Sequence, residues 1–449
     1  MAKKINKLSQ KNGIAWHKGQ LLDRTVFAGH VAKVRENILS NTECNINSEP
    51  ASKVLNLCAD RYHFLVVFVA SMLEGLVTVM PSNRSEGELA RMIEGNKGIQ
   101  SISDVNIDEI CQHKIGNVNN VIQWDSQLIP PRKVVAELYT SGSTGSPRAN
   151  LKTWGQLING AQQICERFGL NDSRPSIIAT VPPQHMFGFE MSIVLPLVCG
   201  VVIHYEQPFY PLDIQRALTE MPKPRVLVTT PLHLKACVTA KKGWPDIEFV
   251  MSATAPMPEN VALQAEDVMN TQVKEVYGCS EAGAIATRRM VNNKSWELLP
   301  DFNLTIENGN AQLQILSSHQ QIALPDKLES KDEGCFQLVG RTSDFIKIGG
   351  KRGSITEIAT RLKAIKGVED AVVFSPDDEG NHRVRLAALV VAPGMNSEDL
   401  RDVLVNEIDP VFMPRPLCVV PALPYDGVGK LPRATLLDSL EKYIKEYHS

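Results

Sequence analysis

Apolar positions in the first hundred residues recur at both helical and strand spacing. Residues 27–38 place apolar side chains three or four positions apart, which predicts an amphipathic helix. Residues 63–74 are strongly apolar and predict a buried helix, and residues 76–80 form a β-branched run that predicts a strand. The longest apolar run, 64–73, is followed by Glu74, so it is shorter than the roughly 18–20 uncharged residues of a membrane span. We therefore expect a core helix that leads into a strand.

From residue 134 onward, short β-rich runs alternate with helix-like segments. The first predicted strand covers residues 134–139, and a helix over 153–168 follows after a loop of small residues. Strands separated by helices are typical of an α/β fold with a largely parallel sheet. The further predicted strands cover 176–181, 201–205, 225–229 and 249–252, and the helices between them cover 191–199, 212–220 and 231–239.

The pattern changes after residue 300. Residues 304–306, 311–315 and 335–338 predict short strands, the first two joined by an Asn/Gly turn, which is typical of an antiparallel sheet. We therefore predict two domains, residues 1–340 with α/β subdomains plus a β subdomain, and residues 341–449 as a small α+β domain. The elements predicted in the small domain are helices over 355–365 and 397–407 and strands over 371–374 and 385–391.

Composition narrows the class of protein by exclusion. The 449 residues are 43% hydrophobic and 22% charged, as in globular proteins, which excludes wholesale disorder. The formal net charge of −3 lacks the basic excess that is typical of nucleic-acid binders. The nine cysteines are scattered without a CxxC pair, which predicts reduced thiols in a cytoplasmic protein. The basic, polar N-terminus has no apolar stretch of the kind found in signal peptides.

Candidate chemistry is concentrated in the loop TSGSTGSPR, residues 140–148, between a predicted strand and a predicted helix. Its glycines let backbone N–H groups approach an anion, and its hydroxyl groups add further donors. Arg148 adds a fixed positive charge whose planar fork suits phosphate oxygens. The Walker A pattern G-x-x-x-x-G-K-[ST] is absent, so the loop predicts a polyphosphate site of another type, with a plain polar turn as the alternative.

Three further segments are individually weaker. In EVYGCSE, the ring of Tyr277 suits stacking on a base and the carboxylate of Glu281 suits Mg²⁺. The segment LVGRTSDFIKIGGKR, residues 338–352, carries paired glycines among charges at the predicted domain boundary and favours a hinge. In LPYDGVGKLPR, Lys430 lies on a glycine-flanked loop. Taken singly, each segment also fits an ordinary exposed loop or linker.

In this order and spacing, the four segments resemble one family: the adenylate-forming superfamily of acyl-CoA synthetases, aryl-acid ligases, nonribosomal-peptide adenylation domains and beetle luciferases. The resemblance covers roughly residues 130–435. It implies a large N-terminal domain and a small C-terminal domain that rotates about a hinge, where Ser343 replaces the usual Asp or Lys. It also implies that a carboxylic acid and ATP form acyl-AMP and pyrophosphate, after which the acyl group passes to a thiol.

The resemblance also assigns contacts with ATP and Mg²⁺ to individual residues. Glu281 is implied to hold Mg²⁺, and Lys430 to be the catalytic lysine that contacts the carboxylate and the α-phosphate. Arg148 stands where the family usually has Lys. The implied phosphate loop consists of Thr140, Ser141, Gly142, Ser143, Thr144 and Gly145. The implied adenosine contacts are Ala255, Pro256, Tyr277, Gly278, Ser280, Asp326 and Arg341, the last two at the ribose.

The acyl pocket is implied to surround the segment PPQHMFGFE, in which His185 counts as a catalytic residue. The apolar lining predicts an aromatic or acyl substrate, although the same side chains would fit core packing. Glu190 is close to the implied pocket but offset, so it either reaches a substrate hydroxyl or has a structural role. The implied lining residues are Met186, Phe187, Phe189, Met251 and Ala282.

PPQHMFGFE and KIGGKRGSITEI are most similar to segments of compact bacterial ligases. These ligases load aryl acids such as 4-hydroxybenzoate onto an acyl carrier protein for aryl-polyene pigments. A carrier protein would meet a basic surface, for which Lys347, Lys351 and Arg352 are candidates, and CoA is the competing acceptor. Three alternatives stay open: a fatty acyl ligase, a phosphotransferase that uses TSGSTG as a γ-phosphate loop, and a degenerate adenylate-binding regulatory protein.

Overall fold

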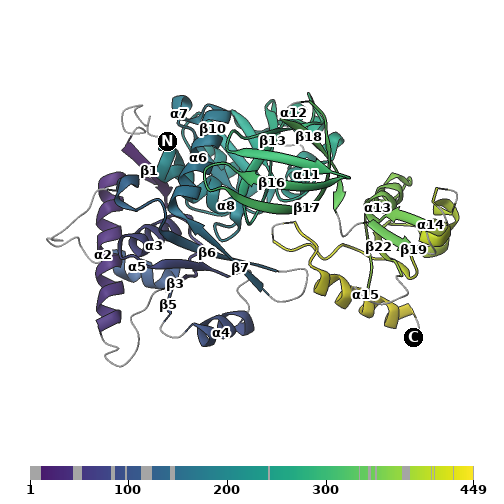
Figure 1. Ribbon diagram of the computed structural model, residues 1–449, viewed down its shortest axis with the longest axis horizontal. Helices are drawn as coiled ribbons and strands as arrows, with labels where there is room; N and C mark the ends of the chain where they lie inside the picture. Colours follow the sequence, from purple (N-terminus) through teal and green to yellow (C-terminus); the bar gives the residue numbers. More distant parts are fainter. Residues whose placement is uncertain are drawn as a thin grey trace. The chain divides into compact units, whose positions relative to one another are not determined.

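The computed structural model describes residues 12–43, 53–81, 86–96, 99–112, 124–141, 147–240, 243–332, 334–341, 345–348, 351–376, 385–405, 407–408, 410–427 and 429–447. The chain divides into two compact units, Met1–Pro300 and Asp301–Ser449 (Figure 1). Both contain sheets and helices, and the first is the larger, which confirms the predicted mixed α/β class. The boundary predicted between residues 340 and 341 lies inside the second unit, and the start of a mobile domain stays a prediction.

One sheet of the first unit carries the candidate phosphate loop. Its strand order is β5-β3-β4-β6-β7, parallel from β5 to β6 and antiparallel at β7. Both helices predicted here form, and α3 (Arg61–Leu73) is buried over almost its whole length because its residues are nearly all apolar. The strands are β3 (Lys53–Asn56), β4 (Val77–Met80), β5 (Gln100–Ile102), β6 (Val134–Ser141) and β7 (Pro147–Thr153), and the other helices are α2 (Arg24–Glu43), α4 (Glu86–Gly95), α5 (Asp104–Gln112) and η1 (Ser126–Leu128).

A second sheet of this unit has the order β14-β13-β12-β11-β10-β8-β9-β1-β2. The strands from β12 to β1 run parallel, as predicted, and antiparallel pairs flank them on both sides. Helices and strands share an apolar core that includes Ile178, Leu227 and Val250. The strands are β1 (Gly13–His17), β2 (Gln20–Asp23), β8 (Ser176–Ala179), β9 (Val202–His204), β10 (Arg225–Thr229), β11 (Phe249–Ser252), β12 (Gln272–Cys279), β13 (Gly283–Arg288) and β14 (Trp296–Leu298).

The helix predicted over 191–199 is part of a longer helical segment. It begins at Met186 as α8 (Met186–Phe189), widens to the π-helix η2 (Glu190–Val194) and ends as α9 (Leu195–Cys199). Pro196 explains the wide turn, because its ring blocks the normal bond to the carbonyl four residues earlier. The other helices of the unit are α6 (Trp154–Phe168), α7 (Leu170–Ser173), α10 (Pro211–Glu220), α11 (Pro231–Thr239) and α12 (Glu259–Met269).

The second unit begins with the antiparallel strands that the sequence predicts. β15 (Phe302–Glu307) and β16 (Asn310–Ile315) are joined at Asn308 and Gly309, both with positive φ, as a tight hairpin requires. β17 (Gln320–Ser330) and β18 (Cys335–Arg341) continue the meander. The long strand β17 is not predicted from the sequence because it contains Pro325, which normally argues against a strand interior.

The rest of the second unit is a small α+β assembly. Its central strand β22 (Ala387–Val391) alternates its side chains between two apolar clusters, one with α13 and α14 and one with α15 (Figure 1). The alternation follows from the two-residue period of a strand. The elements are β19 (Phe345–Ile348), β20 (Lys351–Ser354), α13 (Ile355–Ala364), β21 (Asp370–Phe374), α14 (Ser397–Leu404), η4 (Pro410–Phe412), β23 (Leu417–Val419) and α15 (Arg433–Tyr447).

One expectation about the cysteines is wrong. Cys165 of α6 and Cys199 of α9 form a disulfide, with their Cα atoms 6.6 Å apart. They are 34 residues apart in sequence, and only the packing of α6 beside α9 brings them together. Among the described residues, no helix is both long and apolar enough to cross a membrane.

Candidate functional site

The candidate phosphate loop joins the two antiparallel strands β6 and β7. Thr140 and Ser141 end β6, and Thr140 is the register partner of Arg148, near the start of β7. Gly142, Ser143, Thr144 and Gly145 lie outside the described residues. The helix predicted over 153–168 forms as α6, and the strand β7 lies between the loop and this helix. The helix α6 begins only at Trp154, where Thr153 and Gln156 form a capping box.

Lys152 connects this hairpin with the candidate magnesium segment. It belongs to β7, is 2% exposed, and its Nζ donates a 2.5 Å hydrogen bond to the backbone carbonyl of Glu281. Glu281 itself is exposed and lies in the turn between β12 and β13. The structure therefore brings two segments that are more than a hundred residues apart in sequence to one place. Lys152 is not among the predicted site residues, since a lysine in an alternating strand normally indicates an exposed face.

The turn after β12 has a tight backbone that only small residues allow. The register shifts between Tyr277 and Gly278, and a Cβ at Gly278 would lie 2.2 Å from the carbonyl oxygen of Gly283. Ser280 and Ala282 are half-buried in the same turn. Tyr277 is 9% exposed and its ring lies 5.5 Å from that of Trp296, so its stacking on adenine stays a prediction.

The small-residue turn after β11 lies beside this strand. β11 pairs in parallel with β12, with Ser252 opposite Glu275, so both carboxyl ends are at the same sheet edge. Met251 is fully buried in β11, Ala255 is half-buried and Pro256 is exposed in the following turn. The structure thus brings the predicted adenine contacts of both segments to one edge.

The segment after β8 carries the predicted acyl pocket. His185 caps α8, its Nδ1 accepting a 3.3 Å hydrogen bond from the backbone N–H of Phe187. Met186 and Phe187 are buried, with 8% and 6% exposed. Phe189 is fully buried and its ring packs edge-on against Phe68 of α3. Phe189 therefore matches the alternative of core packing, and its role in a pocket stays a prediction.

Glu190 lies where this helical segment meets β13. Its Oε1 accepts a 3.4 Å hydrogen bond from the backbone N–H of Ala284, and a Cβ at Gly283 would lie 2.2 Å from the same oxygen. Burial raises the pKa of Glu190 to about 7, although the charge of Lys152 acts in the opposite direction. Burial likewise lowers the pKa of Lys152, against the influence of Glu190. The two groups form a buried electrostatic pair beside the Glu281 turn.

Arg61 is a second buried cation that sequence reasoning does not identify. It is fully buried at the start of α3, and its Nη2 donates to the carbonyls of Ala179 and Val181 at 2.9 and 3.1 Å. Its Nη1 donates to Ser192 Oγ at 2.5 Å, and that hydroxyl donates to the carbonyl of Gly188. Burial lowers the pKa of Arg61 to about 10. Arg61 thus fixes the end of β8 to the helical segment that carries His185.

In the second unit, two predicted ribose contacts lie on neighbouring strands. Asp326 of β17 and Arg341 of β18 are register partners. Lys430 has an exposed side chain and lies in a loop closed by Asp426, whose Oδ1 accepts a 2.7 Å hydrogen bond from the backbone N–H of Lys430. Ser343 lies outside the described residues, as do the side chains of Lys347, Lys351 and Arg352.

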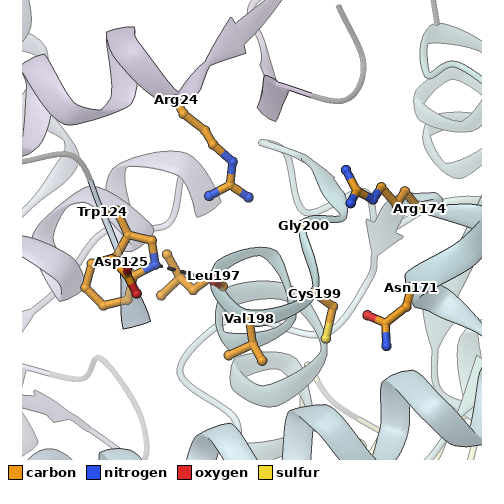
Figure 2. Close-up of a pocket in the computed structure, with 9 residues that line it drawn as sticks. All are labelled: Arg24, Trp124, Asp125, Asn171, Arg174, Leu197, Val198, Cys199 and Gly200. Carbon is orange, nitrogen blue, oxygen red and sulfur yellow. Dashed lines mark hydrogen bonds between the residues drawn. The ribbon is translucent and has the colours of Figure 1, made fainter. Parts of the chain in front are cut away.

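A cavity of about 510 Å³ in the first unit contains none of the predicted site residues. Figure 2 shows the guanidinium groups of Arg24 and Arg174 directed into it from opposite sides. Arg24 Nη2 donates a 3.5 Å hydrogen bond to the carbonyl of Pro196 in α9. Burial and the charge of Arg174 both lower the pKa of Arg24. This bond joins the first residue of α2 to Pro196, the second residue of α9.

Comparison with known proteins agrees with this arrangement. Residues 45–317 match the family of AMP-binding enzymes. The chain is similar to a 4-coumarate–CoA ligase of Halorhodospira halophila, with 28% identity over 301 residues that cover 65% of this chain and 73% of the relative. It is 23% identical over 309 residues to a 3,4-dihydroxybenzoate–[aryl-carrier protein] ligase of Bacillus anthracis, covering 66% and 72%.

The fold is that of a solved structure, ATP-bound MatB from Rhodopseudomonas palustris, with a TM-score of 0.77, 13% identity and 94% of each chain covered. The order of the four motifs and the matched residues lead to the same conclusion. The chain belongs to the AMP-binding enzyme family and is an enzyme of the AMP-forming acid–thiol ligase type.

Proposed function

We propose that this enzyme activates an aromatic carboxylic acid with ATP and transfers the acyl group to a phosphopantetheine thiol. The carboxylate oxygen forms a bond with the α-phosphorus, and the bond between that phosphorus and pyrophosphate breaks. The thiol then attacks the acyl carbon, and AMP leaves with the electron pair. Acyl-AMP is needed because a carboxylate has no adequate leaving group of its own.

The observation that carries the proposal is the bond from Lys152 to the carbonyl of Glu281. It holds the strand that follows the phosphate loop against the turn that bears the magnesium candidate. A site for ATP needs both, because backbone donors bind the phosphates and a carboxylate binds the cation that bridges them.

Charge is the main obstacle to the first step, because an anion must approach a polyanion. At about 4 Å and an effective dielectric constant of about 20, two unit charges repel by about 4 kcal/mol. Lys430 contacts the carboxylate and the α-phosphate together and offsets this repulsion. The exposed Glu281 carboxylate fits Mg²⁺, which supplies further positive charge to the phosphates when bound. The loop from Thr140 to Gly145 holds the departing pyrophosphate.

The substrate class is an aromatic acid of the hydroxybenzoate type. The pocket candidates His185, Met186 and Phe187 follow the end of β8, and two of them are apolar and buried. The two relatives described above are named for 4-coumarate and 3,4-dihydroxybenzoate, both aromatic acids. A fatty acid is the alternative, and it would need a longer apolar channel.

The acceptor is proposed to be an acyl carrier protein, with CoA as the alternative. Lys347 and Arg352 are register partners in the hairpin of β19 and β20, to which Lys351 also belongs. Three basic residues in one hairpin suit contact with an acidic carrier. Rotation of residues 341–449 about Ser343 would move Lys430 away from the acyl-AMP and bring this hairpin to it. This movement rests on the family resemblance.

The decisive experiment is pyrophosphate exchange into ATP with a panel of aromatic and fatty acids. Exchange that depends on an aromatic acid supports the proposal, and CoA and holo carrier protein are then compared as acceptors. Exchange that occurs only with fatty acids would show that the substrate is a fatty acid and not an aromatic acid. ATP binding without exchange for any acid would favour a degenerate binding protein, and ADP as the product would indicate a phosphotransferase.

A further inference from the structure

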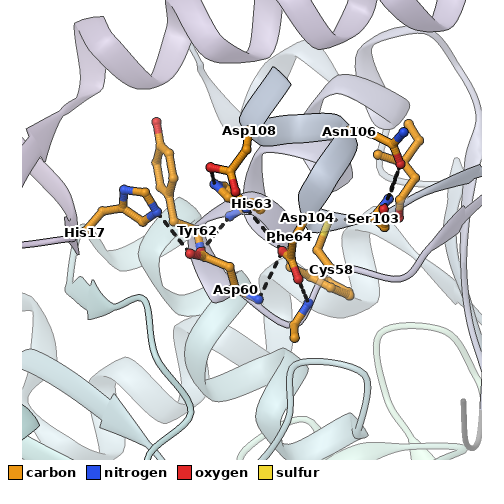
Figure 3. Close-up of polar contacts among 12 residues, drawn as sticks. His17, Cys58, Asp60, Tyr62, His63, Phe64, Ser103, Asp104, Asn106 and Asp108 are labelled. Carbon is orange, nitrogen blue, oxygen red and sulfur yellow. Dashed lines mark hydrogen bonds and ion pairs between the residues drawn. The ribbon is translucent and has the colours of Figure 1, made fainter. Parts of the chain in front are cut away.

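Two histidines and an aspartate meet in the first unit, and none of them is among the site residues assigned above. His17 ends β1, Asp60 is the residue before α3, and His63 lies in the first turn of α3. One ligand atom from each lies within 4.8 Å of the other two (Figure 3). His17 Nε2 is 3.0 Å from Asp60 Oδ2. Asp60 and His63 are three residues apart in sequence, whereas His17 comes from a distant segment that only the fold brings beside them.

Hydrogen bonds orient Asp60 and His63 toward this point. Asp60 Oδ1 accepts from the backbone N–H groups of Tyr62 and His63, which leaves Oδ2 to face His17. His63 Nδ1 lies 3.1 Å from Asp104 Oδ1, and Asp104 in turn accepts from the backbone N–H of Ala59 at 2.8 Å. An Nδ1–H that donates to a carboxylate leaves the Nε2 lone pair for another partner.

A fourth candidate ligand atom, a carboxylate oxygen, lies close to His63. Asp108 Oδ1 lies 3.8 Å from His63 Nε2, beyond hydrogen-bond distance, and 3.0 Å from Lys18 Nζ. Lys18 is more than half exposed, so its side chain is free to turn into solvent when a stronger cation takes its place. His63 is 3% exposed, and the His17 and Asp60 side chains are 14% and 11% exposed, so water has limited access.

We propose that His17, Asp60, His63 and Asp108 bind one divalent transition-metal ion of the zinc type. Two imidazoles and two carboxylates suit four-coordinate Zn²⁺, whereas Mg²⁺ prefers oxygen ligands in an octahedral shell. Asp104 acts as the positioning residue for His63, as carboxylates behind metal-bound histidines do. The ion clamps β1, α3 and α5 together, and its role is structural and separate from that of Mg²⁺ in the adenylation reaction.

The test is a titration of the full chain, without any affinity tag and stripped with a chelator, with Co²⁺. The expected result is binding of one equivalent with the intense visible absorption of tetrahedral Co²⁺, displaced by Zn²⁺. Asp60→Asn keeps the helix cap but removes the anionic ligand, so it should lower the affinity for Co²⁺ at least about tenfold. Asp125→Asn is the matched control, because Asp125 also caps a helix but lies elsewhere.

Two further variants keep the test decisive. Asp104→Asn should weaken Co²⁺ binding by about 10- to 100-fold while retaining one equivalent. His17→Gln should abolish the tetrahedral spectrum, and the exposed His319→Gln should leave it unchanged. Absence of saturable binding in the wild-type chain, or the same affinity in Asp60→Asn and His17→Gln as in the wild type, would overturn the proposal and leave a metal-free ion pair.

Discussion

Lys152 and Glu190 show how single side chains organise the candidate site. Both side chains are buried in the same region. Desolvation lowers the pKa of Lys152 and raises the pKa of Glu190, which favours the neutral form of each, and the charge of the partner acts in the opposite direction. Lys152 donates a hydrogen bond to the backbone carbonyl of Glu281, and the Glu190 carboxylate accepts one from the backbone N–H of Ala284. A buried charge is costly unless it is paired, so the pair fixes the relative positions of β7, η2 and the β12–β13 turn.

The first prediction concerns Lys430. Lys430→Ala should lower acid-dependent pyrophosphate exchange by about 10²- to 10³-fold while ATP binding persists, because one preorganised charge is lost at the transition state. The measurement is exchange at saturating ATP, with nucleotide affinity determined separately by calorimetry. Lys445→Ala, on the exposed face of α15, is the control and should exchange normally. Normal exchange in Lys430→Ala would contradict the assignment.

The second prediction concerns the pH dependence of stability through Glu190. Its folded-state pKa of about 7 lies above the unfolded value, so its contribution to stability is fully present below the unfolded pKa and is lost as pH rises through 7. Glu190→Gln is neutral at every pH. Its free energy of unfolding relative to wild type should therefore rise between about pH 5 and pH 8, by on the order of 3 kcal/mol at most.

Denaturant unfolding at several pH values measures this difference. Glu307→Gln, an exposed glutamate in the second unit, is the control and should show little change with pH relative to wild type. A constant difference between Glu190→Gln and wild type across this range would show that Glu190 is charged in the folded chain at both ends of it.

At the scale of elements, the helical segment from Met186 to Cys199 depends on polar contacts from α3. Arg61 donates to Ser192 Oγ and to the carbonyls of Ala179 and Val181. Ser192 lies in the π-turn from Glu190 to Val194, and its hydroxyl donates to the carbonyl of Gly188. Arg61 thereby joins the chain that precedes His185 to the middle of the helical segment.

The third prediction tests this contact with Ser192→Ala. The change leaves a buried arginine N–H without its acceptor, so the free energy of unfolding should fall by about 1–3 kcal/mol. The KM for the acid should rise because the segment carrying His185 and Phe187 loses its anchor. Chemical denaturation and acid-dependent exchange measure the two effects.

Ser71→Ala is the matched control for this prediction. Ser71 is also fully buried in a helix and donates to the carbonyl four residues earlier, Val67. Among the hydrogen bonds of the described residues, none runs from an arginine or lysine to the Ser71 hydroxyl. The loss of stability should be smaller, and the KM should not change. Equal effects of both substitutions would show that Arg61 contributes nothing through Ser192.

At the scale of the whole molecule, the candidate residues are distributed over two units. The first unit holds the phosphate loop, Glu281 and the acyl segment, and the second holds Asp326, Arg341 and Lys430. Such a distribution suits an enzyme in which one part moves between two half-reactions. The proposed acceptor surface, on β19 and β20, belongs to the second unit as well.

The fourth prediction separates the two half-reactions. Replacing Lys351 and Arg352 together by Glu should raise the KM for a carrier protein at least tenfold, with a weaker dependence on salt, because electrostatic attraction is lost. Pyrophosphate exchange should be unaffected. Replacing Lys442 and Lys445 of α15 by Glu makes the same change in charge and should alter neither activity. Loss of exchange in the first variant would contradict a role confined to the acceptor.

Much of this arrangement follows from local sequence alone. Apolar periodicity predicts α3, the parallel strands β8 to β11 and the Asn/Gly hairpin of β15 and β16, because each pattern reports which face of an element is buried. The phosphate loop and the Glu281 segment are also identified from local sequence, because glycines, hydroxyls and a carboxylate have a characteristic chemistry wherever they occur.

The tertiary structure decided what distant residues do for one another. The burial of Lys152, the burial of Arg61 and the Cys165–Cys199 disulfide all depend on contacts between segments that are far apart in sequence. From local sequence, a charged residue in an amphipathic element is expected to be exposed to solvent. Only tertiary packing supplies the carbonyl groups that accept its hydrogen bonds and allow it to be buried. The assembly of His17, Asp60 and His63 has the same origin, since no spacing in the sequence indicates that β1 ends beside the start of α3.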